Sequence, residues 1–167
     1  MIETFLSGDA EQLKSDLIQN GLDEELRTYL WREVFLARSH HPTSITDWNE
    51  ACVEIVLAYI YNDVDNGVLF VDRFAQACAT VNAKNLIAYC FDYSMEHQTL
   101  YDLLEYAVRC DDLNALKKLQ NTSIDFSLAL TGCSAYNNLK MAEYLLPSTD
   151  PLYFSSYAWF CALEKKH

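Results

Sequence analysis

Histidines and cysteines are the side chains of this sequence best suited to metal binding or nucleophilic catalysis. His40 and His41 are adjacent in a polar segment, but no Asp, Glu or Cys stands at helical spacing to complete a metal-ligand set. Cys90 or Cys133 could act as a nucleophile with His97 as its base, yet neither has flanking glycines of the kind that form an oxyanion hole. The sequence therefore predicts no catalytic residue, cofactor or metal site, and a Cys/His enzyme is the least favoured function.

The carboxylates form a clearer pattern than the nucleophiles. The chain has 24 acidic and 12 basic residues in 167, for a formal net charge of −12. Residues 39–72 and 85–108 contain no Lys or Arg. The acids in these two runs are Asp47, Glu50, Glu54, Asp63, Asp65 and Asp72, followed by Asp92, Glu96, Asp102 and Glu105. This charge disfavours nucleic acid and anionic membranes as ligands and suits a protein partner with a basic surface.

A face that combines acids with tyrosines is the candidate partner-binding site. Exposed tyrosines beside charged groups are common in protein recognition. The predicted site residues are Asp47, Glu50, Glu54, Tyr61, Asp63, Asp65 and Tyr136. The alternative is that these acids lie on separate solvated helix faces and only keep the protein soluble.

The six cysteines, at positions 52, 78, 90, 110, 133 and 161, are widely spaced and form no Cys-x-x-Cys motif. Each lies in an apolar segment, where a free cysteine behaves as a small hydrophobic residue. We therefore expect reduced thiols and a cytoplasmic, reducing compartment. No run of 18 apolar residues is present, so we expect a soluble protein without a membrane span.

These residues are positioned by helices that follow a repeating pattern. The low counts of Gly (4) and Pro (3) favour an all-α fold. Helices are predicted over residues 22–38, 47–63, 68–81 and 83–94, with 47–63 the most buried and the aromatic segment 152–167 a terminal cap. Within residues 101–146 the same helix–turn–helix phrase occurs twice, with Asp112-Leu113 matching Asn138-Leu139, and Asn85-Leu86 is assigned to the same repeat position. We expect a single domain over residues 1–167, with 39–46 as a candidate boundary between sub-blocks.

Residues 7–13, 110–119 and 137–146 resemble the inter-helix turn and second helix of degenerate ankyrin repeats. The Thr-Pro-Leu-His opening of that family is absent, and the spacing is about 26 residues instead of 33. The resemblance implies an α-solenoid of stacked antiparallel helix pairs that binds proteins. Acidic chains of this kind resemble proteins of intracellular bacteria and large DNA viruses that act on host factors, which implies delivery into a host cell.

Three functions are consistent with the sequence. The first is a non-catalytic module, such as a pathogen effector or inhibitor, that binds a basic host or partner protein through its acidic, tyrosine-bearing face. The second is an acidic mimic of nucleic acid that blocks a DNA- or RNA-binding protein. The third is the Cys/His enzyme. The sequence gives no indication of the oligomeric state.

Overall fold

The computed structural model describes residues 1–63 and 66–148. Within these ranges the regular structure consists of ten α-helices and two short 3-10 helices, with no strand, so the all-α prediction is confirmed. The chain divides into two compact units, Met1–Thr99 and Leu100–His167, with the boundary inside one helix. The single-domain expectation stays a prediction, and the predicted terminal helix over 152–167 lies outside the described residues.

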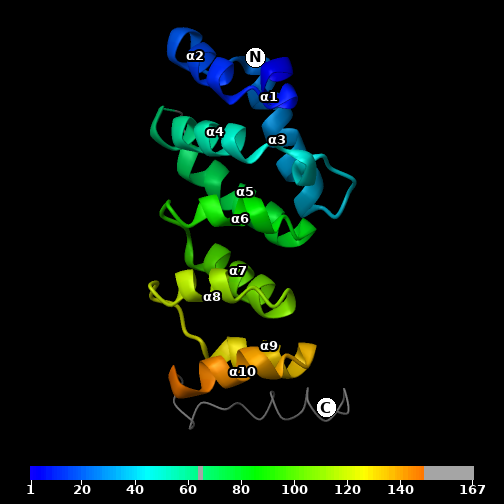
Figure 1. The fold of residues 1–167 in the computed structure, drawn as a ribbon, viewed down its shortest axis with the longest axis vertical. Helices are drawn as coiled ribbons and strands as arrows, with labels where there is room; N and C mark the ends of the chain where they lie inside the picture. The colour runs from blue at the N-terminus through cyan, green and yellow to red at the C-terminus, as the bar shows by residue number, and fades with distance from the viewer. Residues whose placement is uncertain (64–65, 149–167) are drawn as a thin grey trace. The chain divides into compact units, whose positions relative to one another are not determined.

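The helices predicted over 22–38, 47–63 and 83–94 are shorter in the structure, whereas the one predicted over 68–81 begins one residue earlier. Those of the first unit are α1 (Ile2–Ser7), α2 (Ala10–Asn20), α3 (Glu24–Arg38), α4 (Glu50–Asp63), α5 (Gly67–Val81) and α6 (Lys84–Cys90), with the 3-10 helix η1 (Ile45–Asp47) between α3 and α4. The helix α7 (His97–Arg109) crosses the boundary between the units. The helices of the second unit that follow it are α8 (Leu113–Leu119), α9 (Ser127–Tyr136) and α10 (Leu139–Leu145), and then η2 (Leu146–Ser148). Figure 1 shows how these short helices succeed one another as pairs.

One type of turn recurs between paired helices. A residue with left-handed backbone ends the first helix, and its φ is +78° at Gly8, +58° at Asn82, +52° at Asp111 and +53° at Asn137. The next residue then donates its N–H to the carbonyl five positions earlier, over distances from 2.8 to 3.3 Å. Glycine and asparagine tolerate this conformation best, which explains their use at three of these four positions.

The residue that follows the left-handed position caps the second helix. Asp9, Asp112 and Asn138 each accept a hydrogen bond from a backbone N–H in the first turn of that helix. The predicted match between Asp112 and Asn138 is therefore confirmed. The assignment of Asn85 was wrong, because the equivalent cap position is Ala83, whose side chain cannot accept a hydrogen bond.

Stacked aromatic rings form the core of the first unit. The indole of Trp48 lies 5.2 Å from the ring of Phe5 and stacks 5.9 Å from that of Phe74. The ring of Phe74 stacks on that of Phe70, and the ring of Phe70 lies edge to face with that of Trp31, with ring centres 4.9 Å apart. These contacts join α1, α3 and α5 through the segment before α4, so apolar burial unites helices that are each too short to be stable alone.

The helix α5, and not α4, is the most buried element of the first unit. Residues 70–72 and 74–79 of α5 are all buried, whereas α4 keeps Glu50, Ala51, Glu54 and Ala58 exposed. A Cβ on Gly67 would overlap the carbonyl oxygen of Ile60, so α5 starts in close contact with α4. The prediction for residues 47–63 was wrong because small exposed alanines cannot be told from core alanines by composition.

A buried carboxylate holds the long segment between α3 and α4. The Oε2 atom of Glu33 accepts the Ser44 N–H at 2.8 Å and the Thr43 hydroxyl at 3.0 Å, while Oε1 accepts from Arg32 at 3.0 Å. The Ser44 and Tyr29 hydroxyls are 2.6 Å apart, and the Trp48 indole N–H reaches both at 3.2 Å. The segment therefore ends at a fixed place, and Asn49 caps α4.

In the second unit, hydrogen bonds connect the pair α7 and α8 to the pair α9 and α10. The Asn138 side-chain amide donates to the Val108 carbonyl at 2.9 Å. The Lys140 ammonium lies 3.2 Å from the Asp111 carboxylate, and the Tyr144 hydroxyl donates to Gln120 at 2.8 Å. Because two of these contacts involve turn residues, the repeated turn also sets the spacing of the pairs.

We expect Glu33→Gln to lower the free energy of unfolding by about 2 kcal/mol at neutral pH, because an amide NH₂ would face the donors now bonded to the carboxylate. Burial alone would raise the pKa of Glu33, but the bonds from Ser44, Arg32 and Thr43 outweigh it and lower that pKa. The stabilisation should therefore be complete above the unfolded pKa and be lost as pH falls through the lower folded value. Urea unfolding at pH 7 and below pH 4 measures this. Exposed Glu25→Gln is the control, and a difference that does not change with pH contradicts the assignment.

We expect Asn137→Val to lower the free energy of unfolding by about 1–2 kcal/mol, because a β-branched residue is strained at positive φ. Asn137→Gly should cost less than about 0.5 kcal/mol, since glycine adopts this conformation readily. Leu139→Val is the control at an exposed helical position. Equal losses for the valine and glycine variants in thermal unfolding would rule out backbone strain as the reason for Asn137.

Candidate functional site

An open hollow lies on the surface of the first unit where α4 and α6 meet. Its volume is about 540 Å³. The residues that line it, which we call the acidic groove, are Trp48, Asn49, Glu50, Ala51, Glu54 and Tyr89. No Lys or Arg is among them.

The local fold explains how these side chains reach one place. Asn49 accepts the Cys52 N–H at 3.2 Å and so starts α4, which puts Glu50 in its first turn and Glu54 one turn later. In α6, Leu86, Ile87 and Cys90 are buried, which turns Tyr89 toward the surface. The Tyr89 hydroxyl donates to Glu50 Oε2 at 3.4 Å and joins the two helices.

The electrostatics of the groove are negative throughout. Burial and then the charges of Glu50 and Glu54 raise the pKa of the Tyr89 phenol, because carboxylates disfavour a phenolate. Burial, Asp92 and Glu54 likewise raise the pKa of Tyr93, whose ring centre lies 4.8 Å from that of Tyr61. Tyr89 on α6 and Tyr93, three residues after the end of α6, thus both lie close to acidic side chains.

The structure brings together some of the predicted site residues. Glu50 and Glu54 line the groove, whereas Tyr61 does not line it and contacts the ring of Tyr93. Asp47 is exposed at the end of η1 but does not line the groove. The side chain of Asp63 and the whole of Asp65 lie outside the described residues.

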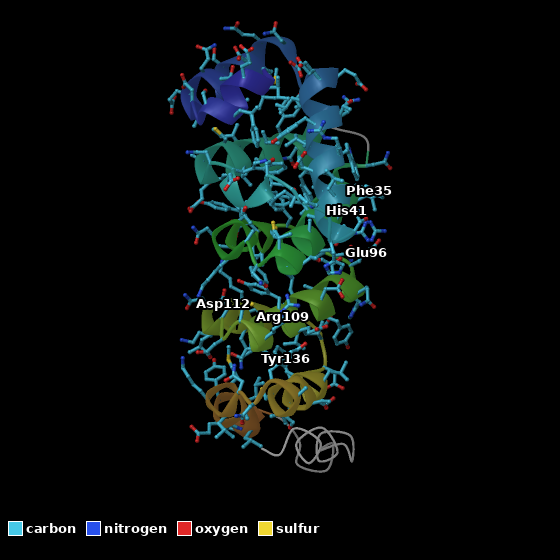
Figure 2. The ribbon with its side chains drawn as sticks, turned by 90° about the vertical axis from the view of Figure 1, so that its right-hand side faces the viewer. Phe35, His41, Glu96, Arg109, Asp112 and Tyr136 are labelled. Carbon is cyan, nitrogen blue, oxygen red and sulfur yellow. The ribbon has the colours of Figure 1, made fainter. Side chains whose placement is uncertain are left out.

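Tyr136 belongs to the second unit. Its side chain is 43% exposed, and its hydroxyl donates to Glu105 Oε1 at 2.9 Å. Burial and this hydrogen bond raise the pKa of Tyr136. It therefore forms a tyrosine–acid pair of its own, and Figure 2 labels its position next to that of Arg109.

Two features of the acidic face differ from the sequence interpretation. Asp72 is buried, and its carboxylate accepts the Glu96 N–H at 2.9 Å, so it does not extend the acidic surface. Tyr89, which is not among the predicted site residues, is partly exposed and lines the groove. The helical phase set by Leu86 and Cys90 was the signal that could have placed Tyr89 outside.

The five cysteines among the described residues are free, and the two candidate nucleophiles, Cys90 and Cys133, are both buried. Burial raises the pKa of Cys133 to about 11 and that of Cys90 further, so both thiols are protonated at neutral pH. His97 is exposed at the start of α7, and the described residues contain no cluster of three or more side chains suited to a metal ion. Cys161 lies outside the described residues.

None of the described helices has the length and apolar composition needed to cross a membrane. The chain matches no protein-family model, no curated protein and no solved structure.

We expect Glu50→Gln to lower the pKa of Tyr89 toward the ordinary value near 10, because it removes a negative charge and replaces a charged acceptor of the phenol proton by a neutral one. NMR titration of ring-labelled tyrosine measures this pKa directly. Tyr93 is the internal control, since Asp92 and Glu54, and not Glu50, raise its pKa. A shift of the same size at both tyrosines would show a global change and contradict the local pairing.

Proposed function

We propose that this chain is a non-catalytic protein-binding module whose acidic groove holds a Lys- or Arg-bearing segment of a partner protein. The observation that carries the proposal is the convergence of Glu50, Glu54 and Tyr89, from the two sequence runs without Lys or Arg, around an open hollow. Two carboxylates one helical turn apart suit the guanidinium and ammonium groups of such a segment.

The tyrosines add a second kind of attraction to the charge. The methylene groups of a lysine or arginine can pack along the ring of Tyr89 while the charged end reaches Glu50 or Glu54. A cation over an aromatic face gains further electrostatic energy. The negative potential also increases the rate at which a basic partner meets the groove.

We further propose that the helix pairs form an α-solenoid similar to degenerate ankyrin repeats. The left-handed turn at four equivalent positions and the hydrogen bonds between successive pairs support this reading. Solenoids bind partners through extended surfaces built from equivalent helices. In this proposal the protein acts in a reducing compartment and, as an effector of the kind that the family resemblance suggests, inside a host cell.

The two alternatives are supported less well. A nucleic-acid mimic needs many carboxylates along one surface, and the burial of Asp72 removes one from the proposed series. An enzyme that uses Cys90 or Cys133 needs an accessible thiolate, which the raised pKa values disfavour.

We expect the double variant Glu50→Lys/Glu54→Lys to weaken the binding of a fluorescently labelled Lys/Arg-rich peptide at least tenfold, because it reverses both charges of the groove. Fluorescence anisotropy at several salt concentrations measures the Kd.

The control Glu11→Lys/Glu143→Lys makes the same change in net charge at exposed positions, one of them also in the first turn of a helix. Equal weakening by both double variants would mean that net charge alone attracts the peptide and would sink the groove as a site. A steep salt dependence together with competition by DNA for the partner would favour the nucleic-acid mimic instead.

A further inference from the structure

The outward side of α3 carries arginines around an exposed phenylalanine. Thr28, Arg32, Phe35 and Arg38 recur at helical spacing and are all exposed. The Phe35 side chain is 65% exposed, although α3 supplies much of the core with its other side. In Figure 2, Phe35 lies at the edge of the first unit and points away from the helices.

The neighbouring helix α5 also carries exposed residues. Among helix pairs of the first unit, α3 packs most extensively against α5. The outward positions of α5 include Leu69, which is 38% exposed, and Arg73, which is partly exposed. We call the surface formed by Arg32, Phe35, Arg38, Leu69 and Arg73 the arginine face.

Charge is segregated between the helices of the first unit. All four arginines of residues 1–99 lie on α3 and α5. Of the acids on these helices, Glu24 and Glu25 lie in the first turn of α3, Glu33 is buried and paired with Arg32, and Asp72 is buried. The exposed positive charge of the arginine face therefore comes mainly from Arg38 and Arg73, in a chain whose formal net charge is −12.

The guanidinium of Arg32 is exposed but held in place. Its side chain is 63% exposed, yet Nε and Nη2 donate to Glu33 Oε1 at 3.2 and 3.0 Å. The same group lies 5.5 Å from the ring centre of Tyr29. These contacts fix the plane of the Arg32 guanidinium. The Arg32 side chain would therefore lose little conformational entropy when a carboxylate binds its outer N–H groups.

We propose that the arginine face binds an acidic polypeptide segment that carries an apolar side chain. Carboxylates of the segment pair with Arg32 and Arg73, and its apolar side chain packs on Phe35 and Leu69. The argument is charge complementarity combined with an aromatic anchor, the combination that concentrates binding energy at protein interfaces. This partner differs in charge from the one that the acidic groove would hold, so the first unit would bind two proteins of opposite charge.

An acidic protein fits this face better than a nucleic acid. A polyanion gains affinity by releasing counterions from many phosphates at once, which requires an extended array of Lys and Arg side chains on the protein. Here the basic side chains are few and belong to a strongly acidic chain. A short acidic segment needs only a few pairings and also uses the apolar side chains, which nucleic acid backbones do not.

The test uses the full chain and a labelled Asp/Glu-rich peptide with a central leucine. We expect Phe35→Ser to weaken binding at least tenfold in fluorescence anisotropy, and Arg73→Glu to weaken it and reduce its salt dependence. Ile18→Ser is the matched control, because Ile18 is an exposed apolar residue, at 76%, on α2 outside the arginine face. Wild type should also bind the leucine peptide more tightly than the same peptide with serine in its place.

Unchanged affinity in Phe35→Ser, with an unchanged unfolding transition, would overturn the proposal. Binding of single-stranded DNA that Phe35→Ser weakens equally would assign the face to nucleic acid. Self-association that Phe35→Ser abolishes in sedimentation would assign it to a second copy of the chain. Glu50→Lys/Glu54→Lys should not weaken binding of the acidic peptide. Failure of the arginine-face proposal can therefore be distinguished from failure of the acidic-groove proposal.

Discussion

The left-handed turn between paired helices is the constraint on which the rest of the structure depends. The described α-helices have 6 to 15 residues, and helices of that length are marginal unless another element covers their apolar side. The turn reverses the chain within two residues, as at Asn137 and Asn138, so that the second helix packs on the first. The same geometry decides which side of each helix stays exposed, and therefore where any binding residue can be.

The buried Glu33 carboxylate connects this scaffold to the acidic groove. It adapts the pattern where α3 and α4 are joined by a long segment instead of the short turn. Glu33 fixes the end of that segment through its hydrogen bond with Ser44. The Trp48 indole N–H in turn donates to the hydroxyls of Ser44 and Tyr29. Trp48 then serves both as a member of the aromatic core and as a wall of the groove. Stability and the candidate site consequently share one hydrogen-bond network.

The sequence predicted those features that leave a mark in side-chain chemistry. Asp9, Asp112 and Asn138 can be recognised as helix caps because their side chains bond to the backbone. Ala83 occupies the same position without a side-chain hydrogen bond, so the prediction placed this position two residues too late, at Asn85. The acids Glu50 and Glu54 were predicted as site residues from the run of sequence without Lys or Arg, and both line the groove. The burial of Asp72 depends on a contact with Glu96, 24 residues away, and no local pattern reports such a contact. To predict the groove itself, one would also have had to know that Tyr89, on another helix, lies next to Glu50 and Glu54.

Two surfaces of opposite charge on one small unit have different kinetic consequences. At physiological salt the screening length is about 8 Å, so each surface acts on a partner mainly through its own nearby charges. The net charge of −12 nevertheless adds a long-range field that speeds a basic partner and slows an acidic one. In the two proposed complexes, the arginine face would therefore depend more on short-range contacts, which the exposed Phe35 beside a pre-oriented Arg32 would supply. The acidic groove, which lacks an exposed apolar anchor of that size, would depend more on attraction at a distance.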